Sequence, residues 1–350
     1  MNEPVKRAKK FWTDFVVRPF KKMSTAMRVV ASLPFLGVLY LLLLWNWPLS
    51  QDEQIHVISP GRSLSAITRQ LNEQGVLPDR ISFRILARLT GTAKRIQAGE
   101  YRFKSGMSER DILSALVQGK QVLYSLRLIE GSTFSDFMQL MASQPKLEQT
   151  LAGLKPSQVM QRLSYGHEHP EGRFFPDTYT YTAGTKDIDI LRQSYIKMQK
   201  VLQTAWNSRA DNLPYKTPYE ALIMASIVEK ETGRPEDRDR IAAVFVNRLR
   251  RNMRLQTDPT VIYGMGSQFD GNLRKRDLQR DTPYNTYTRR GLPPTPISLP
   301  GRDAIQAALH PAPTNDLYFV SRGDGTSEFS ESYIDHNRAV RKYQLGGDRK

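Results

Sequence analysis

The sequence contains no cysteine and only five histidines among its 350 residues. The lack of cysteine excludes a disulfide framework, a thiolate metal site and a cysteine nucleophile. Only His167 and His169 are closely spaced, and no H-E-x-x-H pair accompanies them. A polar loop before Pro170 is therefore a simpler interpretation than a metal site, and we expect neither a metal ion nor a cofactor.

Signatures of nucleic-acid binding are also missing, although the net charge is +16. The chain has no Gly-rich aromatic RNA motif, no zinc-finger spacing and no dense basic stripe outside residues 1–28. That segment concentrates eight basic residues against two acidic ones: Lys6, Arg7, Lys9, Lys10, Arg18, Lys21, Lys22 and Arg28 against Glu3 and Asp14. We expect no nucleic-acid partner, and we interpret residues 1–28 as a cytoplasmic basic tail.

Charge is absent from residues 29–48, and the next charged residue is Asp52. As a helix, this stretch would span about 30 Å, the thickness of a hydrocarbon core. Trp45 and Trp47 lie where an aromatic belt is expected, and the positive-inside rule keeps the basic tail in the cytoplasm. A signal peptide or a buried core helix fits less well, because the apolar run is long and no A-x-A site follows it. The prediction is a single-pass protein of the inner (cytoplasmic) membrane, with a periplasmic or extracellular C-terminal part.

Three stretches after the apolar run share one pattern of an extended segment, a glycine, a hydroxyl residue and a helical period. They begin at His56, Tyr101 and Leu126, and their glycines are Gly61, Gly106 and Gly131. This order predicts a strand, a turn and a capped helix in each. The first stretch resembles a LysM-like module, which we assign to residues 52–124. Glycan contact and a plain spacing role both remain open for this module.

The segment 125–216 is expected to be an αβ connecting region. Within it, P-E-G-R-F-F-P-D-T-Y-T-Y at 170–181 predicts an ordered loop followed by a short strand. Its aromatic rings suit a protein core better than a sugar groove.

Further along, Asp324 and Gly325 lie between two short apolar runs and predict a β-hairpin.

A helix is predicted from Thr217 to Gly233. Thr217 suits the N-cap, Pro218 the first helical position and Glu220 a capping box, while Gly233 suits the stop. The run A-L-I-M-A-S-I-V at 221–228 is apolar nearly all round, so this helix should be buried. We expect it to be the centre of a domain covering residues 217–346.

Two glutamates occupy the end of this helix, Glu229 and Glu231, and they diverge by about 160° around its axis. Glu229 lies above the small residues Ala225 and Ser226, which would leave room for a ligand. The helix end and apolar neighbours both raise the pKa of Glu229, as a general acid requires. The alternative is an ion pair with an arginine of the next helix. Glu231 is interpreted as a supporting or surface residue.

Five further motifs accompany A-S-I-V-E-K-E-T at 225–232: V-F-V-N-R-L-R, M-R-L-Q-T-D-P-T-V-I-Y-G-M-G, P-Y-N-T-Y, G-L-P-P and A-L-H-P-A. Together they resemble the endolytic murein transglycosylase (YceG-like) family over most of the exported chain. The resemblance implies that Glu229 is the catalytic acid. It also implies cleavage between N-acetylmuramic acid and N-acetylglucosamine inside nascent glycan strands, with a 1,6-anhydro end and termination of strand elongation. A peptidoglycan synthase partner is implied only by the resemblance and the anchor.

Residues that could hold a glycan lie mainly in two segments, 254–260 and 283–287, the first of which is expected to be a loop broken by Pro259. Amide, hydroxyl, carboxylate and aromatic side chains suit sugar hydroxyls and acetamido groups. The candidates for substrate binding are Ser226, Gln256, Asp258, Tyr284, Asn285 and Tyr287. The alternative is that Asp258 before Pro259, and Asn285 after Pro283, only order their loops.

The fold prediction is α+β: a single N-terminal transmembrane helix, a LysM-like αβ module and a mixed α+β C-terminal catalytic domain. The expected partners are peptidoglycan glycan strands and the membrane. Two other functions remain open. One is a non-catalytic, membrane-anchored protein that binds or scaffolds the cell wall, and the other is a hydrolase that uses water and Asp258 as a second carboxylate.

Overall fold

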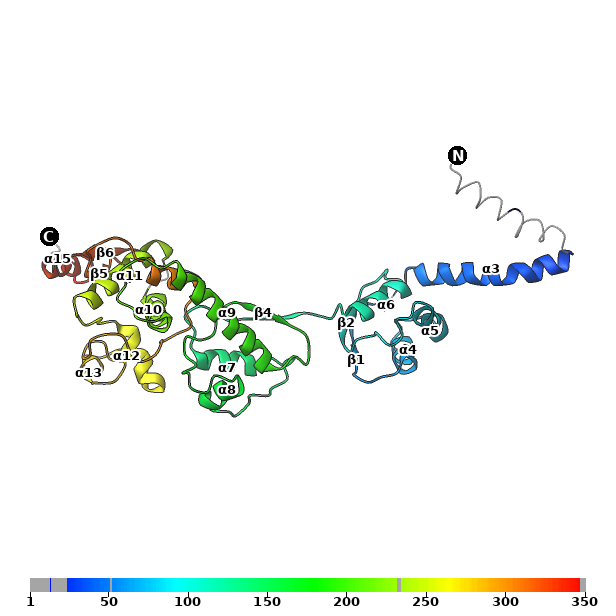
Figure 1. Ribbon diagram of the computed structural model, residues 1–350, viewed down its shortest axis with the longest axis horizontal. Coiled ribbons are helices and arrows are strands. Elements are labelled where there is room, and N and C mark those ends of the chain that lie inside the picture. The colour runs from blue at the N-terminus through cyan, green and yellow to red at the C-terminus, as the bar shows by residue number, and fades with distance from the viewer. Residues whose placement is uncertain (1–12, 14–23, 51, 232–233, 347–350) are drawn as a thin grey trace. The chain divides into compact units, whose positions relative to one another are not determined.

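The computed structural model describes residues 13, 24–50, 52–231 and 234–346. Most of the predicted basic tail lies outside the described residues. The chain divides into two compact units, residues 1–123 and 124–350 (Figure 1). The described part is a mixed α+β protein, as predicted. The names assigned to the residue ranges, and a further division near residue 217, stay predictions.

The apolar run forms helix α3, Thr25–Asn46, which the Ser24 side chain caps by accepting from the Met27 N–H. Among the described residues this is the one helix long and apolar enough to cross a membrane. Pro34 lies inside it. One expectation was wrong: Trp45 does not lie in an aromatic belt, because it is buried in the core of the first unit, whereas Trp47 is 66% exposed.

The remainder of the first unit contains β1 (Gln54–Ile58), α4 (Leu64–Glu73), α5 (Arg80–Leu89), β2 (Gly99–Phe103) and α6 (Glu109–Gln118). The two strands pair antiparallel, with His56 opposite Tyr101. Ser63 caps α4, and Ser108 forms a capping box with Asp111 at α6. Both predicted strand-turn-helix units are therefore confirmed, and their helices pack on one apolar core.

The second unit begins with the third strand-turn-helix unit, which is also confirmed. It consists of β3 (Tyr124–Arg127) and α7 (Phe134–Ala142), with Thr133 and Asp136 forming the capping box. Then follow α8 (Pro156–Arg162), β4 (Thr178–Tyr181) and α9 (Asp187–Asn207). Strand β4 pairs antiparallel with β3. The aromatic residues of segment 170–181 are core residues, as expected: Phe174, Phe175, Tyr179 and Tyr181 are each at most 6% exposed.

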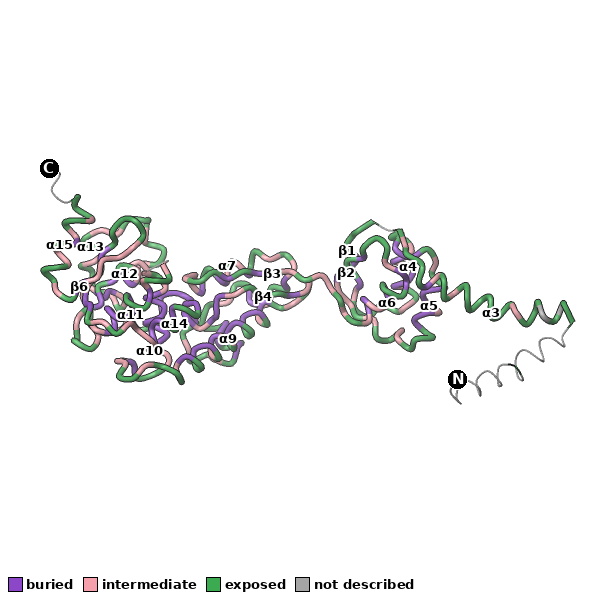
Figure 2. The backbone as a smooth tube through the Cα atoms, turned by 90° about the horizontal axis from the view of Figure 1, so that it is seen from above, coloured by how far each residue is buried: buried purple, intermediate pink, exposed green. Residues whose placement is uncertain are grey.

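Helix α10, Pro218–Glu231, is the buried helix that the sequence predicted. The Thr217 hydroxyl accepts from the Glu220 N–H, and the Glu220 carboxylate accepts from the Lys216 N–H at 2.5 Å. Every residue from 221 to 228 is buried. The helix packs against α9, α11 (Pro235–Arg250) and α14 (Arg302–Leu309), and Figure 2 shows buried backbone along α9 and α14.

The remaining elements of the second unit are α12 (Asp258–Met265), η2 (Gly266–Gln268), α13 (Lys275–Gln279), β5 (Tyr318–Ser321), β6 (Ser327–Ser330) and α15 (Tyr333–Tyr343). Strands β5 and β6 form the predicted hairpin around Asp324 and Gly325. The expected loop at 254–260 was only half right. Pro259 does not break a loop, because it lies in the first turn of α12, where its missing N–H leaves no helical bond unmade.

Candidate active site

Glu229 lies in the last turn of α10 and is partly buried. Its carboxylate Oε2 accepts a hydrogen bond of 2.9 Å from the backbone N–H of Gly301. Gly301 directly precedes α14, so the carboxyl group joins the C-terminal end of one core helix to the N-terminal end of another. Because both helices are anchored in one core, the position of this carboxyl group is fixed by the fold.

Two segments meet beside Glu229, residues 129–133 and residues 299–301. The Gly131 N–H donates to the Leu299 carbonyl at 2.9 Å, and the Leu299 N–H donates to the Ser132 carbonyl at 2.7 Å. The Lys230 ammonium donates to the Gly131 carbonyl at 3.2 Å. The turn at Gly131 is thus held against the end of α10, and these contacts explain why the turn is part of the site.

A second carboxylate reaches this place, and the sequence reasoning missed it. A Cβ atom at position 301 would overlap the Glu130 carboxyl group, so Glu130 packs directly over Gly301. Gly301 has φ −76°, which any residue can adopt, so a larger residue here would have to displace the flexible end of the Glu130 side chain but would not strain the backbone. The one signal in the sequence was that Glu130 directly precedes the glycine turn at Gly131.

The pKa of the Glu229 carboxyl is raised above its usual value. Burial is the largest cause, and the negative charge of Glu130 acts in the same direction, while the Gly301 N–H and Arg238 oppose them. The direction agrees with the sequence prediction. The predicted alternative was an ion pair with an arginine of the next helix, but Arg238 on α11 pairs with Asp303 at 3.3 Å. The carboxyl group can therefore hold a proton nearer neutral pH than an exposed glutamate.

Glu231 has different surroundings on the other side of α10. It accepts a hydrogen bond from the Thr257 hydroxyl and is partly buried, so it is not a plain surface residue. Burial raises its pKa to about 6. It lines a pocket of about 470 Å³. Three of the predicted substrate-binding residues line the same pocket, namely Gln256, Asp258 and Tyr287.

This pocket contains ordered polar and aromatic groups. The Tyr287 hydroxyl donates to Asp258 at 2.5 Å, and the Tyr318 ring stacks on His336 with their centroids 5.1 Å apart. Gln256 has φ +53°, a left-handed conformation that costs free energy in a residue other than glycine. Backbone strain of this kind is often retained where a side chain must face a ligand.

The other three predicted substrate-binding residues make their contacts inside the protein. Ser226 is fully buried, donates to the Ile223 carbonyl at 2.7 Å and accepts from the Ile297 N–H at 3.0 Å. The expected space above Ala225 and Ser226 is therefore filled, because the segment containing Ile297 covers them. The Tyr284 hydroxyl is 2.9 Å from the Thr295 hydroxyl.

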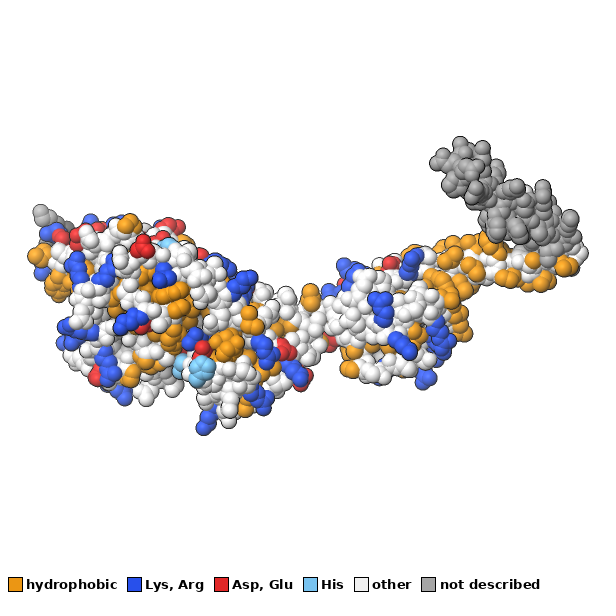
Figure 3. All heavy atoms as spheres, viewed as in Figure 1, with side chains coloured by type: hydrophobic (Ala, Val, Ile, Leu, Met, Phe, Trp, Pro, Cys, Tyr) orange, Lys and Arg blue, Asp and Glu red, His pale blue; other side chains and the backbone are white. Residues whose placement is uncertain are grey.

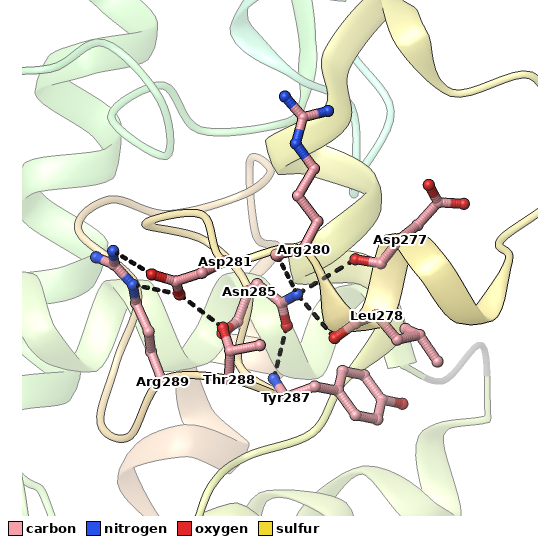
Figure 4. A network of polar contacts seen from close by, with 8 residues as sticks. All are labelled: Asp277, Leu278, Arg280, Asp281, Asn285, Tyr287, Thr288 and Arg289. Atoms are coloured by element: carbon pink, nitrogen blue, oxygen red, sulfur yellow. Dashed lines mark hydrogen bonds and ion pairs between the residues drawn. The ribbon is translucent and has the colours of Figure 1, made fainter.

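Asn285 is fully buried at the centre of a polar network (Figure 4). Its amide nitrogen donates to the carbonyls of Asp277, Leu278 and Arg280, and its amide oxygen accepts from the Tyr287 N–H. These contacts match the loop-ordering alternative. A direct role of Asn285, Ser226 or Tyr284 in substrate binding finds no support in this geometry.

Fold and site together define a class of protein. It is an α+β protein with an apolar N-terminal helix and, at the end of a buried helix, a partly buried glutamate, Glu229, whose raised pKa suits general acid catalysis. Its residues 56–342 match the family model described as the YceG-like family.

Curated relatives agree with this match. The chain is 32% identical over 316 residues to the endolytic murein transglycosylase of Bacillus subtilis (strain 168), covering 85% of this chain and 87% of that protein. It is 28% identical over 320 residues to the endolytic murein transglycosylase of Streptococcus pneumoniae serotype 2, covering 82% of this chain and 57% of that protein.

A solved structure gives the same assignment. The yceG-like protein lmo1499 of Listeria monocytogenes has a TM-score of 0.53 and 29% identity, covering 83% of this chain and 99% of that one. The chain belongs to the YceG-like family. The curated relatives in this family are lytic transglycosylases, so the family is one of enzymes of the lyase class.

Proposed function

We propose that this chain is a membrane-anchored endolytic lytic transglycosylase, which cleaves the bond between N-acetylmuramic acid and N-acetylglucosamine inside nascent peptidoglycan strands. The observation that carries the proposal is the Glu229 carboxyl, held by Gly301 beside Glu130 with a raised pKa. The names of the curated relatives support murein as the substrate.

In the proposed mechanism, protonated Glu229 gives its proton to the glycosidic oxygen as the bond from this oxygen to muramyl C1 breaks. The muramyl C6 hydroxyl oxygen then bonds to C1, and its proton passes to the Glu229 carboxylate. This closes the 1,6-anhydro ring and restores the acid. Oε2 already accepts a hydrogen bond from the Gly301 N–H, so Oε1 is the oxygen available for both proton transfers.

A single carboxyl group is sufficient because the nucleophile belongs to the substrate. An attack within one sugar ring needs no positioned water, since the reacting hydroxyl is already close. A hydrolase would need a second carboxylate to activate water. Asp258 accepts a hydrogen bond from Tyr287 and lines the pocket of Glu231, not the surroundings of Glu229. The hydrolase alternative, in which Asp258 is the second carboxylate, therefore has less support.

The proposal includes a location and partners. Helix α3 supports a single-pass anchor in the inner (cytoplasmic) membrane, with the tail cytoplasmic and the C-terminal unit periplasmic or extracellular. Residues 52–124 are proposed to form a LysM-like module. Cleavage close to the membrane would terminate strand elongation, with a peptidoglycan synthase as partner.

The test is digestion of purified murein by the full-length protein in detergent, with product masses as the readout. Wild type should release fragments with anhydro ends, and Glu229→Gln should release them about a thousandfold more slowly. Glu231→Gln is the matched control, because it changes a neighbouring carboxyl on the same helix. Hydrated reducing ends would establish the hydrolase alternative. Murein that stays intact with the wild-type protein would favour the non-catalytic wall-binding or scaffolding alternative.

A further inference from the structure

Helix α5 in the first unit exposes apolar and basic residues side by side. Ile81, Ile85 and Leu89 recur at every fourth position, and so do Arg80, Arg84 and Arg88, so two parallel stripes run along the helix. Ile81 is 64% exposed and Leu89 is 73% exposed. The opposite face of α5 is buried in the core of the first unit. The ends of both stripes are exposed, whereas Arg84 and Ile85 in the middle are half-buried.

The arginines of this face have few acidic partners. Helix α5 itself contains no acidic residue. Arg80 donates to Asn72 at 2.9 Å and is 3.8 Å from Glu73. Within the described part of the chain, no ion pair involves Arg84 or Arg88. The face therefore carries positive charge that a negatively charged surface could neutralise.

Helix α5 also contacts the end of the membrane helix. The Trp45 indole N–H donates to the Ser82 carbonyl at 3.2 Å, and Leu41 packs against the core of the first unit. Leu41 lies about 9 Å before Trp47 along α3, inside the uncharged run. A unit that covers Leu41 must reach the level at which the apolar run enters the membrane. Figure 3 shows Lys and Arg side chains beside hydrophobic ones on the part of this unit next to α3.

We propose that this face of α5 lies on an anionic lipid bilayer, with Arg80, Arg84 and Arg88 at lipid phosphates and the exposed Ile81 and Leu89 at the acyl boundary. Basic and apolar residues side by side on one helix are typical of helices in the membrane interface. The inference rests on the proposed membrane anchoring. Its consequence is that the first unit lies flat on the membrane and does not swing freely from α3.

The experiment uses full-length protein in nanodiscs, one copy per disc, of phosphatidylcholine alone or with 30% phosphatidylglycerol. Amide hydrogen exchange is measured at residues 80–89. We expect exchange there to be about tenfold slower in the anionic discs, and this difference should disappear in Arg84→Glu/Arg88→Glu. Arg69→Glu, on the exposed face of α4, should keep it. A second variant, Ile81→Ser/Leu89→Ser, should speed exchange in both discs.

Exchange at β1 and β2 reports whether each variant is folded. Equal exchange of α5 in both discs, with α3 inserted, would overturn the inference and leave the anchor intact. Failure of α3 to insert in either disc would overturn the anchoring itself. Slower exchange of α5 only on adding soluble glycan would assign the face to the wall and not to lipid, which also overturns the inference.

Discussion

The two sides of the C-terminal end of α10 carry one glutamate each, and they differ in what holds the carboxyl group. Glu229 accepts from a backbone N–H and has another carboxylate close by. Glu231 accepts from the Thr257 hydroxyl and faces a pocket with tyrosine and histidine rings. Burial raises both pKa values. A raised pKa is therefore insufficient to identify a catalytic acid, and the groups around each carboxyl must decide.

The largest difference is expected from removing each acid in turn. Glu229→Gln keeps the shape but cannot donate a carboxyl proton, so the cleavage rate should fall by about a thousandfold. Glu231→Gln should keep the rate within about tenfold, because its amide can still accept from Thr257. Initial rates of anhydro-end formation measure both. Equal losses in the two variants would contradict the assignment of the acid to Glu229.

The contact at Gly301 can be broken without touching either glutamate. In Gly301→Ala, the new methyl group overlaps the Glu130 carboxyl, which must swing aside and disturb the contacts around Glu229, so the rate should fall by up to about tenfold. The control is the double variant Gly301→Ala/Glu130→Ala, which removes the overlap and should recover part of the rate. A double variant slower than the single one would show that Glu130 and Gly301 act separately.

The elements around this site could be predicted where the signal is local. Capping residues and glycine turns are set by a few neighbouring residues, so the helices beginning after Ser63, Ser108 and Thr133 were found. Glu229 itself was found because the apolar run around it lies on one helix. Ser226, in contrast, was expected to face open space, because nothing local reveals that Ile297 returns to cover it.

Long-range pairing explains the remaining misses. Glu130 reaches the site only because the turn at Gly131 bonds to Leu299, far along the chain. The position of Trp45 at the end of the apolar run is typical of a membrane-interface residue, but its indole N–H donates to the Ser82 carbonyl inside the folded unit. Periodicity and spacing show which face of a helix is apolar. They do not show which distant segment covers it.

The buried Glu231 should also make the stability of the fold depend on pH. Its pKa is about 6 in the fold against an ordinary value of 4.5, so the folded state resists its ionisation. This penalty is absent below about pH 4.5 and is fully present above about pH 6, reaching about 2 kcal/mol at most. Glu231→Gln should therefore gain stability relative to wild type as pH rises from 4.5 to 7. Urea unfolding of the two proteins in detergent at both pH values checks this, and an unchanged difference would contradict it.

The smallest expected effect concerns Glu130, and it tests whether this second carboxylate helps Glu229 to hold its proton. The negative charge of Glu130 raises the pKa of Glu229, so Glu130→Gln should lower that pKa. Because the proposed acid must be protonated to act, the alkaline limb of the pH–rate profile should move to lower pH, by less than one unit for a partly solvated pair. Glu231→Gln serves as the control and should leave this limb in place, since Glu231 has its own surroundings on the other side of α10. An alkaline limb that moves with Glu231 and not with Glu130 would reverse the roles of the two sides of α10.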